Sequence, residues 1–252
     1  MILSKLRRVL DYLEYPQLFR ARRSNVRVDF VAELLRLRDE FHLVPQSIVD
    51  VGANHGEYIR AARFVFPDVF ISAFEPTPVL HENLRTEFEG PLCRIFPYAA
   101  DRENGRQEFH VSGADDLSSL LPPTDELRSR VSTDEQAATT LIEVETRRLD
   151  ELLDFSVTDR PVLIKLDVQG GELRVLQGAT RLLDQVACLK IEFDFDQLYV
   201  GQFSTLDLFS FVLERGFSRF LQVDTHTSDG KLRRCDVLFF RDDDGASRRP
   251  NP

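Results

Sequence analysis

The chain has 252 residues, of which 42% are hydrophobic, and a net charge of -10. This length and composition predict one large domain with a buried core. No apolar run approaches the roughly 18 residues of a membrane span and no signal peptide opens the chain, so we expect a cytoplasmic protein. The acidic balance argues against a nucleic-acid partner, because binding to phosphates is driven by lysine and arginine.

The predicted elements begin with two helices in residues 1–44, which we interpret as an N-terminal helical extension. Apolar residues recur at helical spacing in 3–13 and again in 30–41. Residues 1–27 contain seven lysines and arginines against two acidic residues. A basic amphipathic helix of this kind either packs along the domain with its charges solvated or makes peripheral contact with an anionic membrane or an acidic partner.

A domain over residues 45–241 follows, in which short apolar runs alternate with helical stretches. The runs that predict strands are 48–51, 69–74, 94–98, 162–166 and 187–191. The helices expected around them are 58–66, 78–88, 172–183 and 206–214. This alternation predicts a doubly wound α/β fold whose mostly parallel sheet is covered on both faces. Two last strands, 218–223 and 236–240, flank the turn-like Ser228-Asp229-Gly230 and predict a C-terminal antiparallel hairpin.

One segment, at about 101–149, does not follow the alternation and predicts an insertion. Polar and turn residues dominate it, and strands are expected only at 107–111 and 141–146. Long insertions in α/β domains tend to form lids or binding loops. The charged tail, 242–252, is expected to be disordered. The three cysteines are too few and too scattered for a disulfide framework and are expected to be buried thiols.

The first predicted strand runs into a turn with two glycines, from Asp50 to Gly56. In a doubly wound sheet, ligands bind at the carboxyl ends of the strands, and the first turn must let backbone approach them. Gly52 and Gly56 are placed for that role. Glu75 ends the next strand, where a carboxylate can accept hydrogen bonds from both ribose hydroxyls of an adenosine. The pattern therefore predicts a nucleoside-containing cofactor.

The spacing of the glycines distinguishes between two cofactors. A dinucleotide site needs Gly-x-Gly-x-x-Gly, whereas here Gly52 is followed by Ala53, Asn54 and a histidine before Gly56. S-adenosylmethionine carries no phosphate but has a cationic sulfonium and an amino-acid end, which suit a turn bordered by Asp50 and containing a polar asparagine. The pattern favours S-adenosylmethionine, and a nicotinamide oxidoreductase is the weaker alternative.

An ordered set of motifs between Ser47 and Val223 resembles the FkbM family of methyltransferases. The matching stretches are 48–58, 73–78, 98–101, 163–173, 176–179, 191–193 and 198–199. The resemblance implies a class I methyltransferase (Rossmann-like) fold with a seven-stranded sheet, and S-adenosylmethionine-dependent transfer to a hydroxyl on a sugar or a secondary metabolite. The residues expected to bind the cofactor are Asp50, Gly52, Ala53, Asn54, Gly56, Glu75, Pro76 and Asp101.

Two further stretches bear on the resemblance. Family members often have Glu where this chain has Gln169, so a catalytic carboxylate is excluded at that position. Ser118 and Ser119 resemble a serine-bearing stretch that lies over the acceptor site, and a capped turn explains them equally well.

Asp167 is the leading candidate for the catalytic residue. It ends a buried strand at the same edge of the sheet as Gly52 and Glu75, where it can take the proton that a hydroxyl acceptor must lose, or orient that acceptor. The alternative is that it caps the helix that begins near Gly171. Lys165 shares its face of the strand and is expected to form an ion pair with a neighbouring carboxylate.

Acidic residues also end the next strand, at Glu192 and Asp194. Catechol O-methyltransferase-like enzymes hold magnesium with carboxylates at these two strand ends, so a metal at Asp167 with either residue is an open alternative, and we assign no metal ligand. The histidines His55, His81 and His110 are more simply explained as structural or solvated than as bases. The leading hypothesis is an S-adenosylmethionine-dependent O-methyltransferase. The alternative is a module that binds the cofactor without turnover and docks on a membrane or a protein partner.

Overall fold

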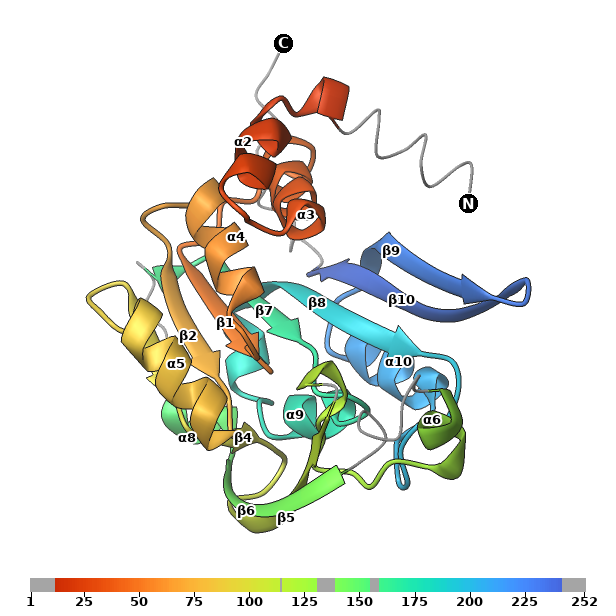
Figure 1. Ribbon diagram of the computed structural model, residues 1–252. Coiled ribbons are helices and arrows are strands. Elements are labelled where there is room, and N and C mark those ends of the chain that lie inside the picture. Colours follow the sequence, from red (N-terminus) through yellow and green to blue (C-terminus); the bar gives the residue numbers. More distant parts are fainter. Residues whose placement is uncertain (1–11, 114, 131–138, 155–158, 242–252) are drawn as a thin grey trace.

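A seven-stranded sheet forms the centre of the computed structural model, which describes residues 12–113, 115–130, 139–154 and 159–241. The strand order is β3-β2-β1-β7-β8-β10-β9 (Figure 1). All neighbouring strands are parallel except that β10 is antiparallel to both β8 and β9. The predicted doubly wound, mostly parallel sheet with a C-terminal hairpin is confirmed.

The strands of this sheet lie where the apolar runs predicted them, except that the two hairpin strands each extend five residues further toward their turn than predicted. They are β1 (Ser47–Val51), β2 (Phe70–Phe74), β3 (Cys93–Phe96), β7 (Val162–Leu166), β8 (Val186–Asp194), β9 (Arg219–Ser228) and β10 (Lys231–Phe240). A second, three-stranded sheet consists of β4 (Ala99–Ala100), β6 (Thr139–Arg147) and β5 (Gly105–Ser112), in that order, and two of these strands, β5 and β6, lie in the segment predicted as an insertion. The three cysteines are buried free thiols, as expected.

Helices cover both faces of the large sheet. One face carries α2 (Gln17–Arg23), α3 (Val28–Asp39), α4 (Glu57–Val65) and α5 (Pro78–Phe88). The other carries α8 (Leu149–Leu152), α9 (Glu172–Gln177), the short 3-10 helix η3 (Leu182–Gln185) and α10 (Thr205–Glu214). The insertion adds η1 (Asp115–Leu117) and α6 (Asp125–Arg130). No helix within the described ranges is long and apolar enough to cross a membrane.

The N-terminal helices pack directly on the sheet. Leu18 of α2 and Leu34 of α3 are fully buried in the same apolar cluster as Ile48 of β1 and Leu163 of β7. Burial of such apolar side chains is the main favourable term for docking these helices. The first part of the predicted N-terminal helix, the polar stretch 131–138 and the tail from residue 242 lie outside the described residues.

Candidate active site

The turn after β1 brings residues that the sequence predicts to bind the cofactor against the end of β7. Gly52 has a positive φ of 79°, and a Cβ built there would lie 1.9 Å from the backbone oxygen of Asp167. The N–H groups of Gly52 and Ala53 both donate to the carbonyl of Phe74, at 3.1 and 3.0 Å. Gly56, with a φ of 75°, ends the turn and precedes α4. Only glycine fits at position 52, because any side chain would overlap the neighbouring strand end.

Glu75 follows β2 and reaches back to this turn. Its Oε2 accepts the N–H of Asn54 and its Oε1 accepts the N–H of Thr77, both at 2.9 Å. Burial raises the pKa of the Glu75 carboxyl, and the backbone donors oppose that rise. Each oxygen keeps a lone pair for a further donor, so the carboxylate is oriented to accept the hydroxyls of a ribose.

Asn54 supplies a second group that suits a bound ligand. Its φ is 47°, and its Oδ1 is buried without a hydrogen-bond partner among the described residues. Pro76 lines the same cleft as Asn54 and Glu75. Because a buried acceptor without a donor is costly, this turn fits a cofactor that presents an N–H or O–H group.

Lys165 links the cofactor turn to the candidate base. Its Nζ lies 3.0 Å from Asp50 Oδ1 and 3.6 Å from Asp167 Oδ2, and it donates to the carbonyl of Gly52 at 2.8 Å. This confirms the expected ion pair. Asp50 is fully buried; burial raises the pKa of its carboxyl, and Lys165 opposes that rise. The ion pair with the buried Asp50 therefore fixes the position of the Lys165 side chain.

Asp167 has 37% of its side chain exposed, and it lines the cleft. Burial acts to raise the pKa of Asp167, but Lys165 and a hydrogen bond from Gln169 outweigh it and hold the pKa below its ordinary value. The residue before α9 is Gly171, and no side chain within the described ranges caps that helix. The structure therefore does not support the alternative role of Asp167 as a helix cap.

Gln169 is the residue that the sequence did not single out for a role. Its Nε2 donates to Asp167 Oδ1 and to Glu192 Oε2, both at 2.9 Å. The hydroxyl of the fully buried Tyr199 lies 3.2 Å from its Oε1. Gln169 has a positive φ of 55° and is itself buried. The amide nitrogen thus bridges two carboxyl groups with its two N–H donors.

Arg234 of β10 completes the far side of this cluster. Its Nη1 lies 3.0 Å from Glu192 Oε1, and its Nε lies 2.8 Å from Asp194 Oδ1. Burial and the charge of Asp167 raise the pKa of Glu192 well above its ordinary value, against the effect of Arg234. Within the part of the chain that is described, no group of three or more His, Cys, Asp or Glu side chains is arranged to hold a metal ion. The guanidinium stands between the two carboxylates considered for magnesium.

Asp101 differs from the other predicted cofactor residues. Its carboxylate is bound at 2.7 and 2.6 Å by Arg174, and at 2.6 Å by Gln107. Burial acts to raise the pKa of Asp101, but the bond from Arg174 and its other donors hold that pKa below the ordinary value. The side chain has no exposed surface, although the residue borders the cleft. Its carboxylate is thus used to tie α9 to the insertion.

The two serines of the insertion have different surroundings. Ser119 is buried, and its hydroxyl donates to the carbonyl of Gln169 at 2.8 Å and accepts the N–H of Leu121 at 3.0 Å. Ser118 accepts the N–H of Ser112 at 3.0 Å and borders the cleft. Ser119 thus fastens the insertion onto the turn that carries the bridging glutamine.

One cleft of about 1670 Å³ joins these groups. It begins at the turn between Gly52 and Glu75, passes Asp167 and Glu192 at the carboxyl edge of the sheet, and continues between α3 and the β9–β10 hairpin. Ligands of doubly wound sheets bind at this edge. A carboxylate that is ionised and reachable stands in it beside the turn that fits a nucleoside.

The sequence matches a family model described as a methyltransferase FkbM domain over residues 50–219. It is also 33% identical over 198 residues to the 2-O-methyltransferase NoeI of Sinorhizobium fredii, covering 73% of this chain and 80% of that protein.

Two solved structures have a low similarity to this chain. The N-terminal domain of EvdMO1 with bound SAH is 12% identical at a TM-score of 0.46, covering 87% of this chain and 84% of that one. Magnesium protoporphyrin IX methyltransferase from Synechocystis, with bound SAM, is 12% identical at a TM-score of 0.43, covering 84% and 76%. These scores are too low to bear on the site.

The family match covers more than half of the chain, and the curated relative covers more than two thirds of it. The sheet order and the C-terminal hairpin are those of the class I methyltransferase fold. A cofactor-binding module without turnover is not favoured. The chain belongs to the FkbM family of methyltransferases and is an S-adenosylmethionine-dependent O-methyltransferase.

Proposed function

We propose that this enzyme methylates a hydroxyl group on a sugar or glycan, with Asp167 as the residue that accepts the proton. The observation that carries the proposal is the position of Asp167: its carboxylate faces the cleft with 37% of the side chain exposed, and its backbone oxygen touches the cofactor turn at Gly52. Glu57 is the other exposed carboxylate that lines the cleft beside that turn, and it is paired with Arg27 at 2.5 Å.

The cofactor is assigned to the turn between β1 and α4. Glu75 is oriented to accept the ribose hydroxyls, Asn54 offers a buried acceptor with no hydrogen-bond partner in the described part of the chain, and Gly52 lets the backbone approach. When bound, S-adenosylmethionine supplies the methyl group, whose bond to sulfur breaks as its bond to the acceptor oxygen forms. These residues bind and orient, and the same rigid turn fixes the distance to the end of β7.

The proton of the acceptor hydroxyl passes to Asp167. Lys165 and Gln169 keep this carboxylate ionised at neutral pH, so it is ready to accept a hydrogen bond from the hydroxyl and then its proton. The proton then leaves to water through the open side of the cleft. Gln169 acts as a positioning residue, because it holds the carboxylate in one orientation.

Two features support a sugar hydroxyl as the acceptor. The relative NoeI is by its name a 2-O-methyltransferase. The cleft beyond Asp167 is bordered mainly by polar and charged side chains such as Gln222 and Asp224, which suit a polyol. A hydroxyl of a secondary metabolite is the nearest variant of this proposal.

The test begins with binding and proceeds to transfer. Calorimetry is expected to detect micromolar binding of S-adenosylhomocysteine to the full chain and its loss in Glu75→Ala. Transfer of labelled methyl groups to a panel of sugars is then expected, and Asp167→Asn is expected to lower its rate by about 100-fold or more, the size of a lost general base. Asp68→Asn, on an exposed turn, is the matched control. Unchanged transfer in Asp167→Asn refutes the role of Asp167.

A further inference from the structure

The cleft is larger than a pocket for a single ligand, and its lining extends beyond the residues assigned to the cofactor and to the reacting hydroxyl. A pocket for a single drug-sized ligand measures about 300–1000 Å³, whereas this cleft measures about 1670 Å³. The turn between Gly52 and Glu75 is assigned to the cofactor, and Asp167 to the reacting hydroxyl. The space that remains runs away from both, between the start of α3 and the β9–β10 hairpin.

The two walls of this space come from opposite ends of the chain. Arg27 and Phe30, at the start of α3, border one side, and the exposed side chains of Gln222, Asp224 and His226 on β9 border the other. The hairpin projects from the body of the domain, which makes its wall long (Figure 1). We call this space, between these five residues, the hairpin groove.

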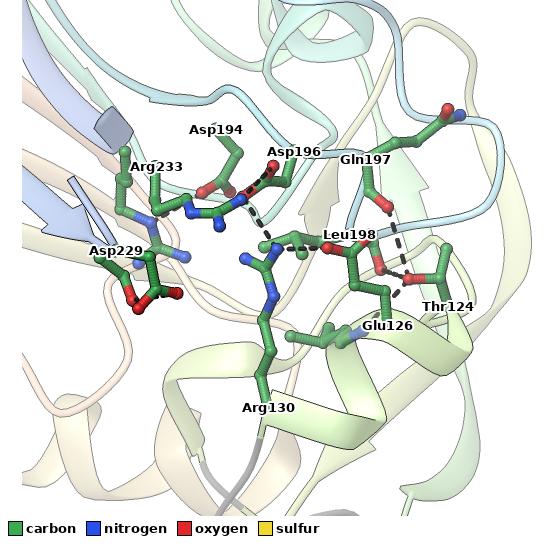
Figure 2. A network of polar contacts seen from close by, with 12 residues as sticks. Thr124, Glu126, Arg130, Asp194, Asp196, Gln197, Leu198, Asp229 and Arg233 are labelled. Atoms are coloured by element: carbon green, nitrogen blue, oxygen red, sulfur yellow. Dashed lines mark hydrogen bonds and ion pairs between the residues drawn. The ribbon is translucent and has the colours of Figure 1, made fainter. Parts of the chain in front are cut away.

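Four cations around the groove are paired with carboxylates. Arg27 pairs with Glu57 of α4, and Lys190, on the floor, pairs with Glu33 of α3 at 2.9 Å. At the far end, Arg130 of α6 and Arg233 of β10 both bind Asp196, each at 2.9 Å (Figure 2). An anionic ligand would have to break such pairs, whereas a neutral one can bond to them as they stand.

The aromatic ring of Phe30 adds an apolar surface to this polar groove. It lies 5.0 Å from the guanidinium carbon of Arg27 and 5.5 Å from Lys190 Nζ. A ligand with many hydroxyls and apolar C–H faces satisfies both kinds of surface, because hydroxyls donate and accept while C–H faces pack on rings. A chain of sugar units has this character along its whole length.

We infer that the hairpin groove is a binding site for the further units of a neutral oligosaccharide, whose methylated unit lies at Asp167. This inference rests on the proposed function and deepens it: the enzyme acts on a glycan chain rather than on a free monosaccharide. The β9–β10 hairpin and the start of α3 then determine which chain is accepted, and Asp167 determines which hydroxyl reacts.

Transfer of labelled methyl groups to neutral gluco-, manno- and galacto-oligosaccharides of one to four units tests the inference. For the series that is methylated, kcat/KM is expected to rise at least tenfold from one unit to three, since two or three added hydrogen bonds suffice for that factor. Asp224→Ala and His226→Ala are expected to reduce this length ratio at least fivefold. Thr227→Ala is the control, because it is exposed on the same strand but outside the cleft.

The outcomes separate the two proposals. Methylation of sugars with the same kcat/KM for one and four units overturns the groove and leaves the proposed function standing. The groove is also overturned, and the proposed function again stands, if the length ratio is high but Asp224→Ala, His226→Ala and Thr227→Ala all leave it unchanged. Binding of S-adenosylhomocysteine without transfer to any of these sugars refutes the proposed acceptor class and the groove with it.

Discussion

Replacing Gly52 by alanine tests the link between the cofactor turn and the candidate base. The φ of 79° is left-handed, which costs an L-residue about 1–2 kcal/mol. The new Cβ would also lie 1.9 Å from the Asp167 backbone oxygen, where real Cβ atoms keep at least 3.0 Å. The turn or the end of β7 must therefore move by about an ångström, and a displacement of that size costs about 100-fold in rate.

We expect Gly52→Ala to lower methyl transfer by about 100-fold or more and to weaken S-adenosylhomocysteine binding. The matched control is Gly230→Ala, because Gly230 has a similar φ of 73° and a Cβ there would meet no heavy atom of the described residues within 4 Å. It should lose only about 1–2 kcal/mol of unfolding free energy and keep its activity. Activity of Gly52→Ala within threefold of the parent chain would refute the close contact between turn and base.

Three other substitutions test the polar and charged side chains around Asp167. Gln169→Leu removes a hydrogen-bond donor to the Asp167 carboxylate that is worth about 1.5–3 kcal/mol, so the pKa of Asp167 should rise by about one to two units. The acid limb of the pH profile of kcat/KM should move to higher pH by the same amount, and a limb that does not move contradicts this prediction. Burial raises the pKa of Glu172 to about 7 from 4.5. The contribution of this protonated carboxyl to folding stability is therefore fully present below pH 4.5 and is lost as the pH rises to about 7. Glu172→Gln should therefore gain up to about 3 kcal/mol in urea unfolding at pH 8 relative to pH 4, and a gain equal at both pH values would reject the titration. Lys165→Met leaves the buried Asp50 carboxylate without its ion-pair partner and should lower the unfolding free energy by about 3–5 kcal/mol. A loss under about 1 kcal/mol in the same assay would show that the Lys165–Asp50 pair does not stabilise the fold.

Much of the sheet was predictable because its strands are buried on both faces. A continuous apolar run such as 162–166 has few alternatives in a chain that also contains helical stretches, and β7 occupies those five residues. Strand ends were less predictable: β8 extends to Asp194, beyond the apolar run, because Arg234 on the neighbouring strand pairs with its last acidic residues. Polar pairs across a sheet leave no periodic signal in either strand.

The helix expected over 172–183 is shorter than its apolar pattern suggested. α9 ends at Gln177, and η3 follows only at Leu182. Gly178 ends the helix where the chain touches the insertion, since a Cβ there would lie 2.1 Å from the backbone oxygen of Asp101. This contact joins residues far apart in sequence, so helical periodicity alone could not reveal it.

The candidate site was predictable wherever parallel topology decides. Gly52, Glu75 and Asp167 follow three different strands, and a parallel sheet brings the carboxyl ends of those strands to one edge. Arg234 was not predictable, because its place beside Glu192 depends on the register of an antiparallel hairpin. Local sequence motifs therefore predict the cofactor side of the cleft, whereas they do not predict the acceptor side.

Charge balance around the base explains why an amide suits position 169. Lys165 lies beside Asp167, and Arg234 lies beside Glu192, so each cation already faces a carboxylate. The side chain between the two carboxylates must donate to both, and the Gln169 amide does so without adding charge. A glutamate there would need a bound proton to donate at all, and it would donate to one side only. An amide at position 169 is thus consistent with an Asp167 that stays ionised at neutral pH.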